Sequence, residues 1–368
     1  MTVRKNKTTG KWEFDLSRGQ DPVTGKRKRY TKRGFKTRRE AKEAEEHFLL
    51  NQLGETTSTQ KAPISMLYQL MLVDDKDKKE SYKDTNHYNY NKHIKGYFKD
   101  ANIALLTYKE IEEFRDTLPK KKLANSSINK QMILLKKILD VAVKRGFIKE
   151  NPCIHLKKLK EDKKRMEYWT AEEFQYFLSL FEPDEYPYEL FCKIAFSTGM
   201  RQGEILGLTW EDIDLRKGTI DINKTLVDLS YRTVINEPKT KAGTREVTIQ
   251  SKLAEELADW KNRQKNLLSP FTTDVNKLQV LQFVPDLMDR HKVSKKFKKV
   301  ISRSDTLKRI RVHDLRHSHA ALLIHNQEAP YIIKERMGHS TIKTTYDTYG
   351  HLYPNAQKTV SDKLENLY

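Results

Sequence analysis

Cysteine is scarce in this chain of 368 residues, since only Cys153 and Cys192 occur. They lie far apart and show neither a CxxC pair nor the Cys and His spacing of a zinc site. A structural disulfide would fit a cytosolic protein poorly. We therefore expect two reduced and mostly buried thiols, and we expect no metal site built on cysteine.

Long apolar runs are also missing. No stretch of about 18 apolar residues occurs, which is the length that a membrane-spanning helix needs. The basic N-terminus lacks the apolar segment of a secretory signal. Hydrophobic residues make up 37% and charged residues 33% of the chain, which is typical of a soluble globular protein. We expect a cytoplasmic protein of two or three domains with no membrane contact.

Acidic residues are outnumbered. The chain has 70 Lys and Arg against 50 Asp and Glu, a formal net charge of +20. Such a field attracts polyanions, and basic side chains that contact phosphates release condensed counterions. Nucleic acid is thus the first candidate partner. Charge alone leaves open ribosomal binding, an anionic membrane surface and mere solubility.

Basic residues are densest in segment 1–55, where positions 1–40 alone carry a net charge of +10. Apolar and charged residues alternate at 12–16, which is strand periodicity, and the extended pattern resumes near Tyr30. Thr37 and Glu40 have the spacing of a helix capping box. We expect a small three-stranded sheet plus one helix, with aromatic residues among basic ones, that contacts DNA.

Residues 56–62 are polar and are interpreted as a linker. The pattern of residues 63–155 predicts an all-helical domain. Several amphipathic stripes have helical spacing, and we interpret them as core. The longest predicted helix follows Ser127 and ends at Arg145. A charged connector at 156–165 follows this domain.

The last segment, 166–368, predicts a mainly helical domain with a small β-sheet. Residues 220–222 and 245–249 alternate as strands. The sequence KTKAGT at 239–244 has the composition of a hairpin loop between them. The predicted fold class is therefore α+β and multidomain.

Three motifs in this segment carry candidate chemistry, and the first contains Arg201. Gly199 permits a tight turn after an apolar helix, so Arg201 would begin a new helix with its guanidinium free. A planar, permanently charged guanidinium matches phosphate well. Glu204 lies on the same helix face and could orient Arg201 or cap the helix. An ordinary Arg–Glu helix pair is the alternative.

The second motif is HDLRHSHA at 313–320. His313 and Arg316 lie three residues apart, so both would face one way on a helix. A histidine donor beside an arginine suits an anionic transition state. Alternatively, His313, His317 and His319 could bind a metal, although no acidic or cysteine partner has a familiar spacing, or they could be scattered surface histidines.

The third motif joins His339, in MGHS, to Tyr349 ten residues later. A tyrosine can attack phosphorus if an arginine-rich site favours the phenolate. However, Tyr346, Tyr349 and Tyr353 also have the spacing of one helical face, which is the pattern of aromatic packing.

RQGE at Arg201, HDLRHSHA, and GHS followed by YGH at Tyr349 occur in the order seen in the tyrosine recombinase, or phage integrase, family, which this chain resembles. The resemblance covers the whole chain. Segment 1–55, with DPVTGKRKRYTKRGFKTRREA, resembles the arm-type DNA-binding module of phage and conjugative-element integrases of low-GC Gram-positive bacteria. Segment 63–155 resembles the SAM-like core-binding domain, and 166–368 resembles the catalytic domain.

The resemblance implies roles for the residues that match. Arg201 and Arg316 resemble the pair that clamps the scissile phosphate. Lys239 resembles the hairpin lysine that protonates the leaving 5′ oxygen, with Lys241 as the alternative. His313 resembles the histidine that donates to a nonbridging oxygen or moves a proton.

His339 resembles the second histidine of the family, and Tyr349 resembles the nucleophile that forms a 3′-phosphotyrosyl link. The spacing between them is one residue longer than in several members, which leaves Tyr346 as the alternative nucleophile. The chain shows no carboxylate cluster for Mg²⁺, so neither a metal nor another cofactor is expected.

The implied function is site-specific recombination that integrates and excises a mobile element or prophage. The implied partners are double-stranded DNA, at arm and core attachment sites, and three further copies in a homotetramer on DNA. A host DNA-bending protein and an excision factor are left open. The expected location is the bacterial cytoplasm, at the nucleoid. A non-catalytic DNA-binding regulator and a type IB topoisomerase are the rival interpretations.

Overall fold

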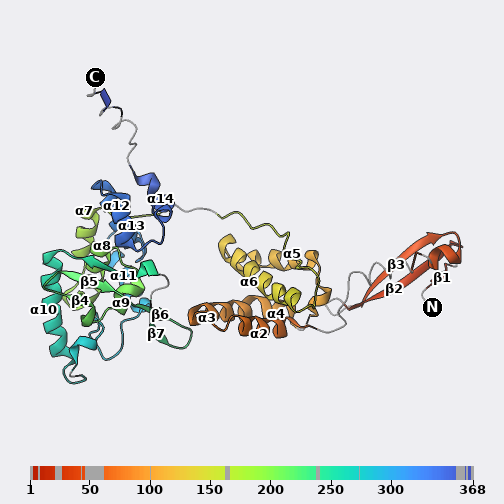
Figure 1. The fold of residues 1–368 in the computed structure, drawn as a ribbon, viewed down its shortest axis with the longest axis horizontal. Helices are drawn as coiled ribbons and strands as arrows, with labels where there is room; N and C mark the ends of the chain where they lie inside the picture. The colour runs from red at the N-terminus through yellow and green to blue at the C-terminus, as the bar shows by residue number, and fades with distance from the viewer. Residues whose placement is uncertain are drawn as a thin grey trace. The chain divides into compact units, whose positions relative to one another are not determined.

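A computed structural model gives the fold (Figure 1). The chain divides into two compact units, Met1–Lys163 and Lys164–Tyr368. The structure describes residues 3–6, 9–20, 27–42, 44–45, 62–99, 101–161, 166–237, 241–272, 274–353, 361 and 364–365. Among these residues, no helix is both long and apolar enough to cross a bilayer.

The N-terminal part of the first unit is an antiparallel sheet in the order β1 (Val3–Lys5), β2 (Trp12–Gln20) and β3 (Arg27–Phe35). Phe14 is fully buried and its ring stacks on Phe35. Glu13 is buried on the opposite face of the strand. It forms ion pairs of 2.9 and 3.2 Å with Arg4 and Arg33. The expected three-stranded sheet is confirmed.

A helix follows the sheet at residues 38–42 and 44–45, as expected. The main-chain N of Glu40 donates to Thr37 Oγ1 at 3.1 Å, and the N of Thr37 donates to Glu40 Oε2 at 3.4 Å. These reciprocal bonds are the predicted capping box. The expected continuation of the helix beyond residue 45 lies outside the described residues.

The rest of the first unit is helical, as expected. Its elements are α2 (Ile64–Asp74), α3 (Glu80–Asn89), a π-helical turn (Tyr90–Ile94), α4 (Lys95–Phe98), α5 (Tyr108–Thr117) and α6 (Asn125–Lys144). The helix α6 begins three residues before the predicted start and ends where predicted, with Arg145 as its C-cap. Its apolar face packs on α2, and both helices contribute to one buried core.

The second unit is mainly helical around a small sheet. Its helices are α7 (Ala171–Leu178), α8 (Tyr186–Thr198), α9 (Gln202–Gly207), α10 (Ser251–Leu268), α11 (Arg290–Ile301), α12 (Asp314–His325), α13 (Pro330–Met337) and α14 (Ile342–Tyr349). The antiparallel sheet has the order β4 (Ile213–Asp214), β5 (Thr219–Ile222), β8 (Arg245–Thr248). The predicted fold class is confirmed.

One detail of the predicted sheet is wrong. The strands β5 and β8 do pair, with Ile220 opposite Val247, but no simple hairpin joins them. A second hairpin, β6 (Thr225–Asp228) with β7 (Thr233–Asn236), lies between them in the chain. Only Leu226 is buried on these two strands, so their sequence lacks the alternation that marks a half-buried strand.

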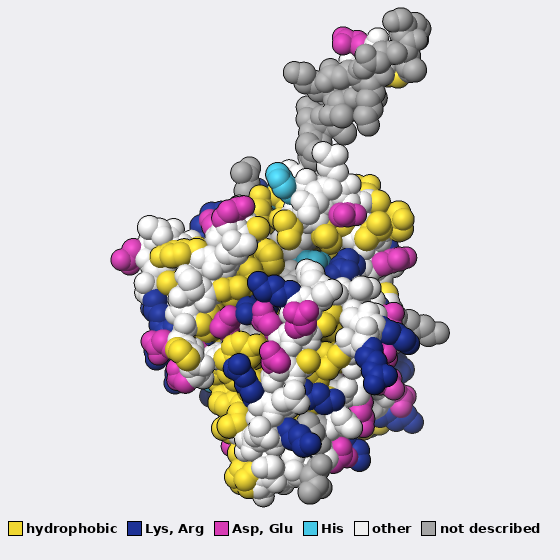
Figure 2. Space-filling model, turned by 90° about the vertical axis from the view of Figure 1, so that its left-hand side faces the viewer, with side chains coloured by type: hydrophobic (Ala, Val, Ile, Leu, Met, Phe, Trp, Pro, Cys, Tyr) yellow, Lys and Arg dark blue, Asp and Glu magenta, His cyan; other side chains and the backbone are white. Residues whose placement is uncertain are grey.

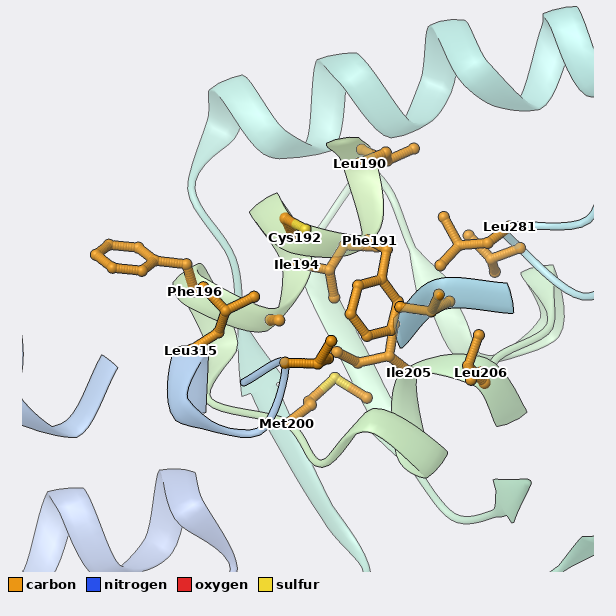
Figure 3. Packing of buried hydrophobic residues seen from close by; sticks show 14 of the residues in the cluster. Leu190, Phe191, Cys192, Ile194, Phe196, Met200, Ile205, Leu206, Leu281 and Leu315 are labelled. Carbon is orange, nitrogen blue, oxygen red and sulfur yellow. The ribbon is translucent and has the colours of Figure 1, made fainter. Parts of the chain in front are cut away.

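The core of the second unit gathers around α8 (Figure 3). Leu190, Phe191 and Ile194 of α8 belong to one buried cluster with Ile205 of α9 and Leu315 of α12. This packing brings the C-terminal end of α8 and the N-terminal ends of α9 and α12 together. Arg201 is the N-cap of α9, and His313 and Arg316 lie at the start of α12, so two of the three candidate motifs begin at these helix ends.

Both cysteines are free and buried, as expected: Cys153 lies in the first unit and Cys192 in the core of the second. Burial raises the pKa of Cys153 to about 12.

On the face of the second unit in Figure 2, basic and acidic side chains are interspersed with apolar ones. The basic excess of the chain therefore does not gather on that face.

Candidate active site

Arg201 is placed by the turn between α8 and α9. Gly199 ends α8 in the left-handed conformation, with φ of 65°, and Arg201 is the N-cap of α9. Its Nη1 lies 2.7 Å from Oε1 of Glu204, and its Nη2 donates to the carbonyl of Gly338 at 3.3 Å. The side chain remains 42% exposed. The guanidinium is thus held by Glu204 and Gly338 and is still partly open to solvent; the Arg–Glu helix pair given as the alternative is present.

Glu204 is a buried carboxylate that holds two arginines. Besides Arg201, it accepts a bond of 3.1 Å from Nη2 of Arg245, which is itself buried. Its Oε2 also accepts the main-chain N of Arg201 at 2.9 Å, which caps α9. Burial raises the pKa of Glu204, but Arg245 and Arg201 outweigh burial and hold that pKa below its ordinary value. Sequence analysis missed Arg245.

Arg316 is buried on α12 and joins three segments. Its Nη1 donates to the carbonyl of Gly199 and its Nη2 to the carbonyl of Met337, the last residue of α13. Burial, together with the nearby Arg201, lowers the pKa of Arg316. A guanidinium remains charged near neutral pH all the same. The site therefore keeps two positive charges close together.

His313 immediately precedes α12 and reaches solvent, and its ring lies perpendicular to that of His317 with 5.1 Å between centroids. Although His313 is exposed, nearby protein atoms displace part of the water around its ring, which lowers its pKa. The positive charge of Arg316 lowers this pKa further. His313 and Arg316 thus lie near each other, although one is exposed and the other buried.

Tyr349 ends α14 and is 1% exposed. Its ring lies in an apolar cluster with residues of α12 and α13. The ring of His339 lies nearly parallel to it, with 6.3 Å between centroids and an interplanar angle of 14°. The Nδ1 of His339 is 2.9 Å from Oγ1 of Thr345, which orients the imidazole.

The two arginines near Tyr349 do not by themselves set its pKa. Burial raises the pKa of its phenol to about 12, although Arg316 and Arg201 act to lower it. Desolvation of the phenolate outweighs the two guanidinium charges. The hydroxyl therefore keeps its proton at neutral pH.

His317 contacts the hydroxyl of Tyr349, and the sequence analysis missed this role. Its Nδ1 lies 2.8 Å from Tyr349 Oη. Burial, followed by the nearby His313, lowers the pKa of His317 to about 4. The spacing from His313 to His317 is four residues, one turn of helix, and that spacing could have placed both on one face.

The three tyrosines of the predicted stripe do take part in packing, but to different extents. Tyr349 is buried, whereas Tyr346 is 49% exposed. The ring of Tyr346 packs against Tyr353, at 5.8 Å between centroids. The structure therefore gives the two candidate nucleophiles different surroundings.

Lys239 lies outside the described residues, and so does the side chain of Lys241. His319 points away from the other two histidines of its motif: it is buried, and its Nδ1 lies 2.7 Å from the carbonyl oxygen of Phe196. In the part of the chain that the structure describes, no group of three or more His, Cys, Asp or Glu side chains could hold a metal ion.

Comparison of the sequence with known proteins shows the family of this chain. Residues 167–356 match the model of the phage integrase family, residues 2–52 an arm DNA-binding domain and residues 68–159 a phage integrase SAM-like domain. The chain is 39% identical over 371 residues to the ICEBs1 integrase of Bacillus subtilis strain 168, with 100% of both chains covered. The chain belongs to the phage integrase family.

Solved structures of other integrases share the fold. A Tn1549 transposon integrase in complex with circular intermediate DNA superposes with a TM-score of 0.70 at 19% identity, covering 83% of this chain and 99% of its own. A lambda integrase dimer bound to a core site gives a TM-score of 0.61 at 17% identity, with 94% of each chain covered. This member of the phage integrase family is therefore a tyrosine-type site-specific DNA recombinase, an integrase.

Proposed function

We propose that this integrase cuts DNA by attack of Tyr349 on the scissile phosphorus. The products are a 3′-phosphotyrosyl link and a free 5′ hydroxyl. The observation that carries the proposal is the convergence of Arg201, Arg316 and Tyr349 from three separate segments. The phosphotyrosyl ester retains the bond energy, so rejoining to a partner strand needs no ATP.

Arg201 and Arg316 would clamp the nonbridging oxygens of the phosphate. Both guanidinium groups are held by main-chain carbonyls, so their positive charge is preorganised and needs little rearrangement as the transition state forms. His313 and His339 would donate to the same oxygens or move protons. Each ring contacts another ring of the site, which supports such a placement.

Lys239 would protonate the leaving 5′ oxygen, with Lys241 as the alternative. This assignment rests on the resemblance alone.

We further propose that residues 1–55 bind arm sites, residues 63–155 bind core sites and residues 166–368 carry catalysis, joined by segments 56–62 and 156–165. The family matches at 2–52, 68–159 and 167–356 support this division. The working unit would be a homotetramer on double-stranded DNA at the nucleoid, and a lambda integrase forms a tetramer on a Holliday junction. A host DNA-bending protein and an excision factor stay open as further partners.

The biological outcome would be integration and excision of a mobile element. Similarity over the full length to the ICEBs1 integrase supports a conjugative element, and similarity to the integrase of Staphylococcus phage L54a over 46% of this chain keeps a prophage as the second candidate.

Covalent capture on nicked suicide substrates tests the proposal. The substrates carry the junction sequences that flank the gene, and the buffer contains EDTA. Wild type and Tyr346→Phe should form an SDS-resistant protein–DNA adduct, and Tyr349→Phe should not. An adduct with Tyr349→Phe would move the nucleophile elsewhere. Tight binding without an adduct from any of the three proteins would favour a non-catalytic regulator.

Deletion of residues 1–55 tests the division of labour. The truncated protein should still cleave core sites but should no longer integrate DNA that carries arm sites. Integration at the wild-type rate would contradict an arm-binding role for this segment.

A further inference from the structure

The hydroxyl of Tyr349 lies within hydrogen-bond distance of the imidazole of His317. Among the described residues, Nδ1 of His317 is the hydrogen-bond partner of Tyr349 Oη, at 2.8 Å. The two rings meet edge to face, with 5.6 Å between centroids. The expected set of catalytic residues leaves this histidine without a role.

We propose that His317 is a further catalytic residue, which takes the phenolic proton of Tyr349 at Nδ1 as the tyrosine oxygen attacks phosphorus. The inference rests on the proposed role of Tyr349 as nucleophile. It requires the neutral imidazole to carry its proton on Nε2, so that Nδ1 accepts the hydroxyl.

The step balances without any further reactant. A bond forms between Tyr349 Oη and phosphorus, and the bond from phosphorus to the 5′ oxygen breaks. The phenolic proton passes to His317, while a separate acid protonates the leaving oxygen. In rejoining, the 5′ hydroxyl attacks phosphorus and gives its proton back to the conjugate base of that separate acid. The imidazolium of His317 returns its own proton to the departing phenolate.

The starting protonation states of the two groups are the ones that this exchange requires. With the pKa of Tyr349 raised to about 12 and that of His317 lowered to about 4, the phenol is protonated and the ring is neutral. The groups that face His317 are His313, Asp314, Arg316, Arg311, His339 and Tyr349. Of these described groups, the carboxylate of Asp314 favours the imidazolium, and an incoming phosphate would add a second negative charge.

The geometry also makes proton acceptance compatible with phosphate binding. His317 follows Arg316 directly on α12, and Arg316 is fixed by two carbonyls. The ring of His313 packs against the edge of His317. The proton acceptor is therefore held next to the phosphate clamp on one rigid helix, and reaches the hydroxyl of α14 from there.

The experiment uses the full-length protein and the nicked suicide substrate. The variants are His317→Asn, whose amide can occupy the place of Nδ1 but cannot take a proton, and His317→Ala. The control is His325→Asn, an exposed histidine on the same helix. Each protein is also tested on a substrate with a sulfur in place of the bridging 5′ oxygen, which needs no acid to leave, and from about pH 6 to about pH 9.

We expect His317→Asn and His317→Ala to bind DNA like wild type and to form adduct about 10²-fold more slowly or worse, which is the usual loss for a general base. Both should stay slow on the sulfur substrate, because their defect lies in the nucleophile. Their rates should rise with pH, because hydroxide must then remove the phenolic proton. Replacing Tyr349 by the more acidic 3,5-difluorotyrosine should restore His317→Asn at least about tenfold.

Three results would overturn proton transfer to His317. One is cleavage by His317→Asn at the wild-type rate, since the amide preserves position but not basicity. The second is rescue by the sulfur substrate, which would place the defect at the leaving group. The third is failure of difluorotyrosine to restore His317→Asn, which would mark a structural defect. If Tyr349 is not the nucleophile, the Tyr349→Phe variant will still form an adduct, and this result is distinct from the three above.

Discussion

Glu204 and Arg245 form a buried ion pair, in which Nη2 of Arg245 lies 3.1 Å from Oε2 of Glu204. Because the other carboxylate oxygen holds Arg201, the pair links a residue on the sheet to the proposed phosphate clamp. A buried carboxylate with two arginine partners is costly to neutralise, since each guanidinium would lose its counter-charge.

We therefore expect Glu204→Gln to destabilise the second unit by about 3–5 kcal/mol, the usual range for breaking a buried pair. Urea unfolding followed by tryptophan fluorescence would measure this, since Trp169, Trp210 and Trp260 all lie in that unit. The control is Glu246→Gln, an exposed neighbour on β8, which should cost less than about 0.5 kcal/mol. Equal midpoints for the two variants would contradict the role of Glu204.

Arg201→Lys should slow adduct formation by on the order of 10²–10³, with little change in DNA affinity. A lysine ammonium cannot contact Glu204, the carbonyl of Gly338 and a phosphate together, because it lacks the planar fork. Single-turnover cleavage at saturating enzyme would measure the rate. Arg216→Lys, at an exposed site, should cleave like wild type. A lysine variant of Arg201 that also cleaved normally would remove this residue from the clamp.

Gly199→Ala should destabilise the second unit more than Gly218→Ala. Both glycines have φ of 65°, so the backbone penalty is shared. A Cβ at Gly199 would lie 2.5 Å from Cδ2 of His319 and 2.8 Å from Sδ of Met337, whereas at Gly218 it would meet only a carbonyl at 3.4 Å. Overpacking should add about 1–3 kcal/mol at Gly199. Thermal unfolding of the paired variants would detect the difference, and indistinguishable curves would refute the tight packing.

The second unit should lose stability as the pH falls below about 6.5, the ordinary pKa of histidine. Burial, followed by the nearby Arg336, lowers the pKa of His319 to about 3. Between these values the unfolded chain binds a proton that the folded chain does not. Stability is thus full above the unfolded pKa and decreases below it, by at most about 1.4 kcal/mol per pH unit for one group.

Urea midpoints at about pH 7.5 and about pH 5.5 would measure this pH dependence. In His319→Asn the drop should be smaller, because the amide does not titrate there, whereas in the exposed His325→Asn it should match wild type. An unchanged drop in His319→Asn would assign the effect to other groups.

Much of the fold could be predicted from local patterns. The capping box at Thr37 and Glu40, the amphipathic face of α6 and the glycine end of α8 each depend on neighbours within a few residues. The hairpin β6–β7 was missed because its strands bury almost nothing. Periodicity marks strands only through burial.

The site residues that belong to a local sequence motif could be predicted. The contacts between residues far apart in the sequence could not. Motif order placed Arg201, Arg316 and Tyr349 together, and the structure does bring them together. Arg245 reaches Glu204 across 41 residues, which no local pattern marks. The raised pKa of Tyr349 reflects burial by α12 and α13. It therefore depends on tertiary packing.

The bond between Arg316 and the carbonyl of Met337 has a consequence for synthesis on the ribosome. The N-terminal sheet and the helices α2 to α6 are complete long before residue 337 is translated, so a nascent chain can fold the parts proposed to bind DNA first. The proposed active site forms only when the last segment has folded back onto α12. With the roles proposed above, a polypeptide whose translation stops before Tyr349 would occupy DNA without breaking it, and would compete with finished copies for the same sites.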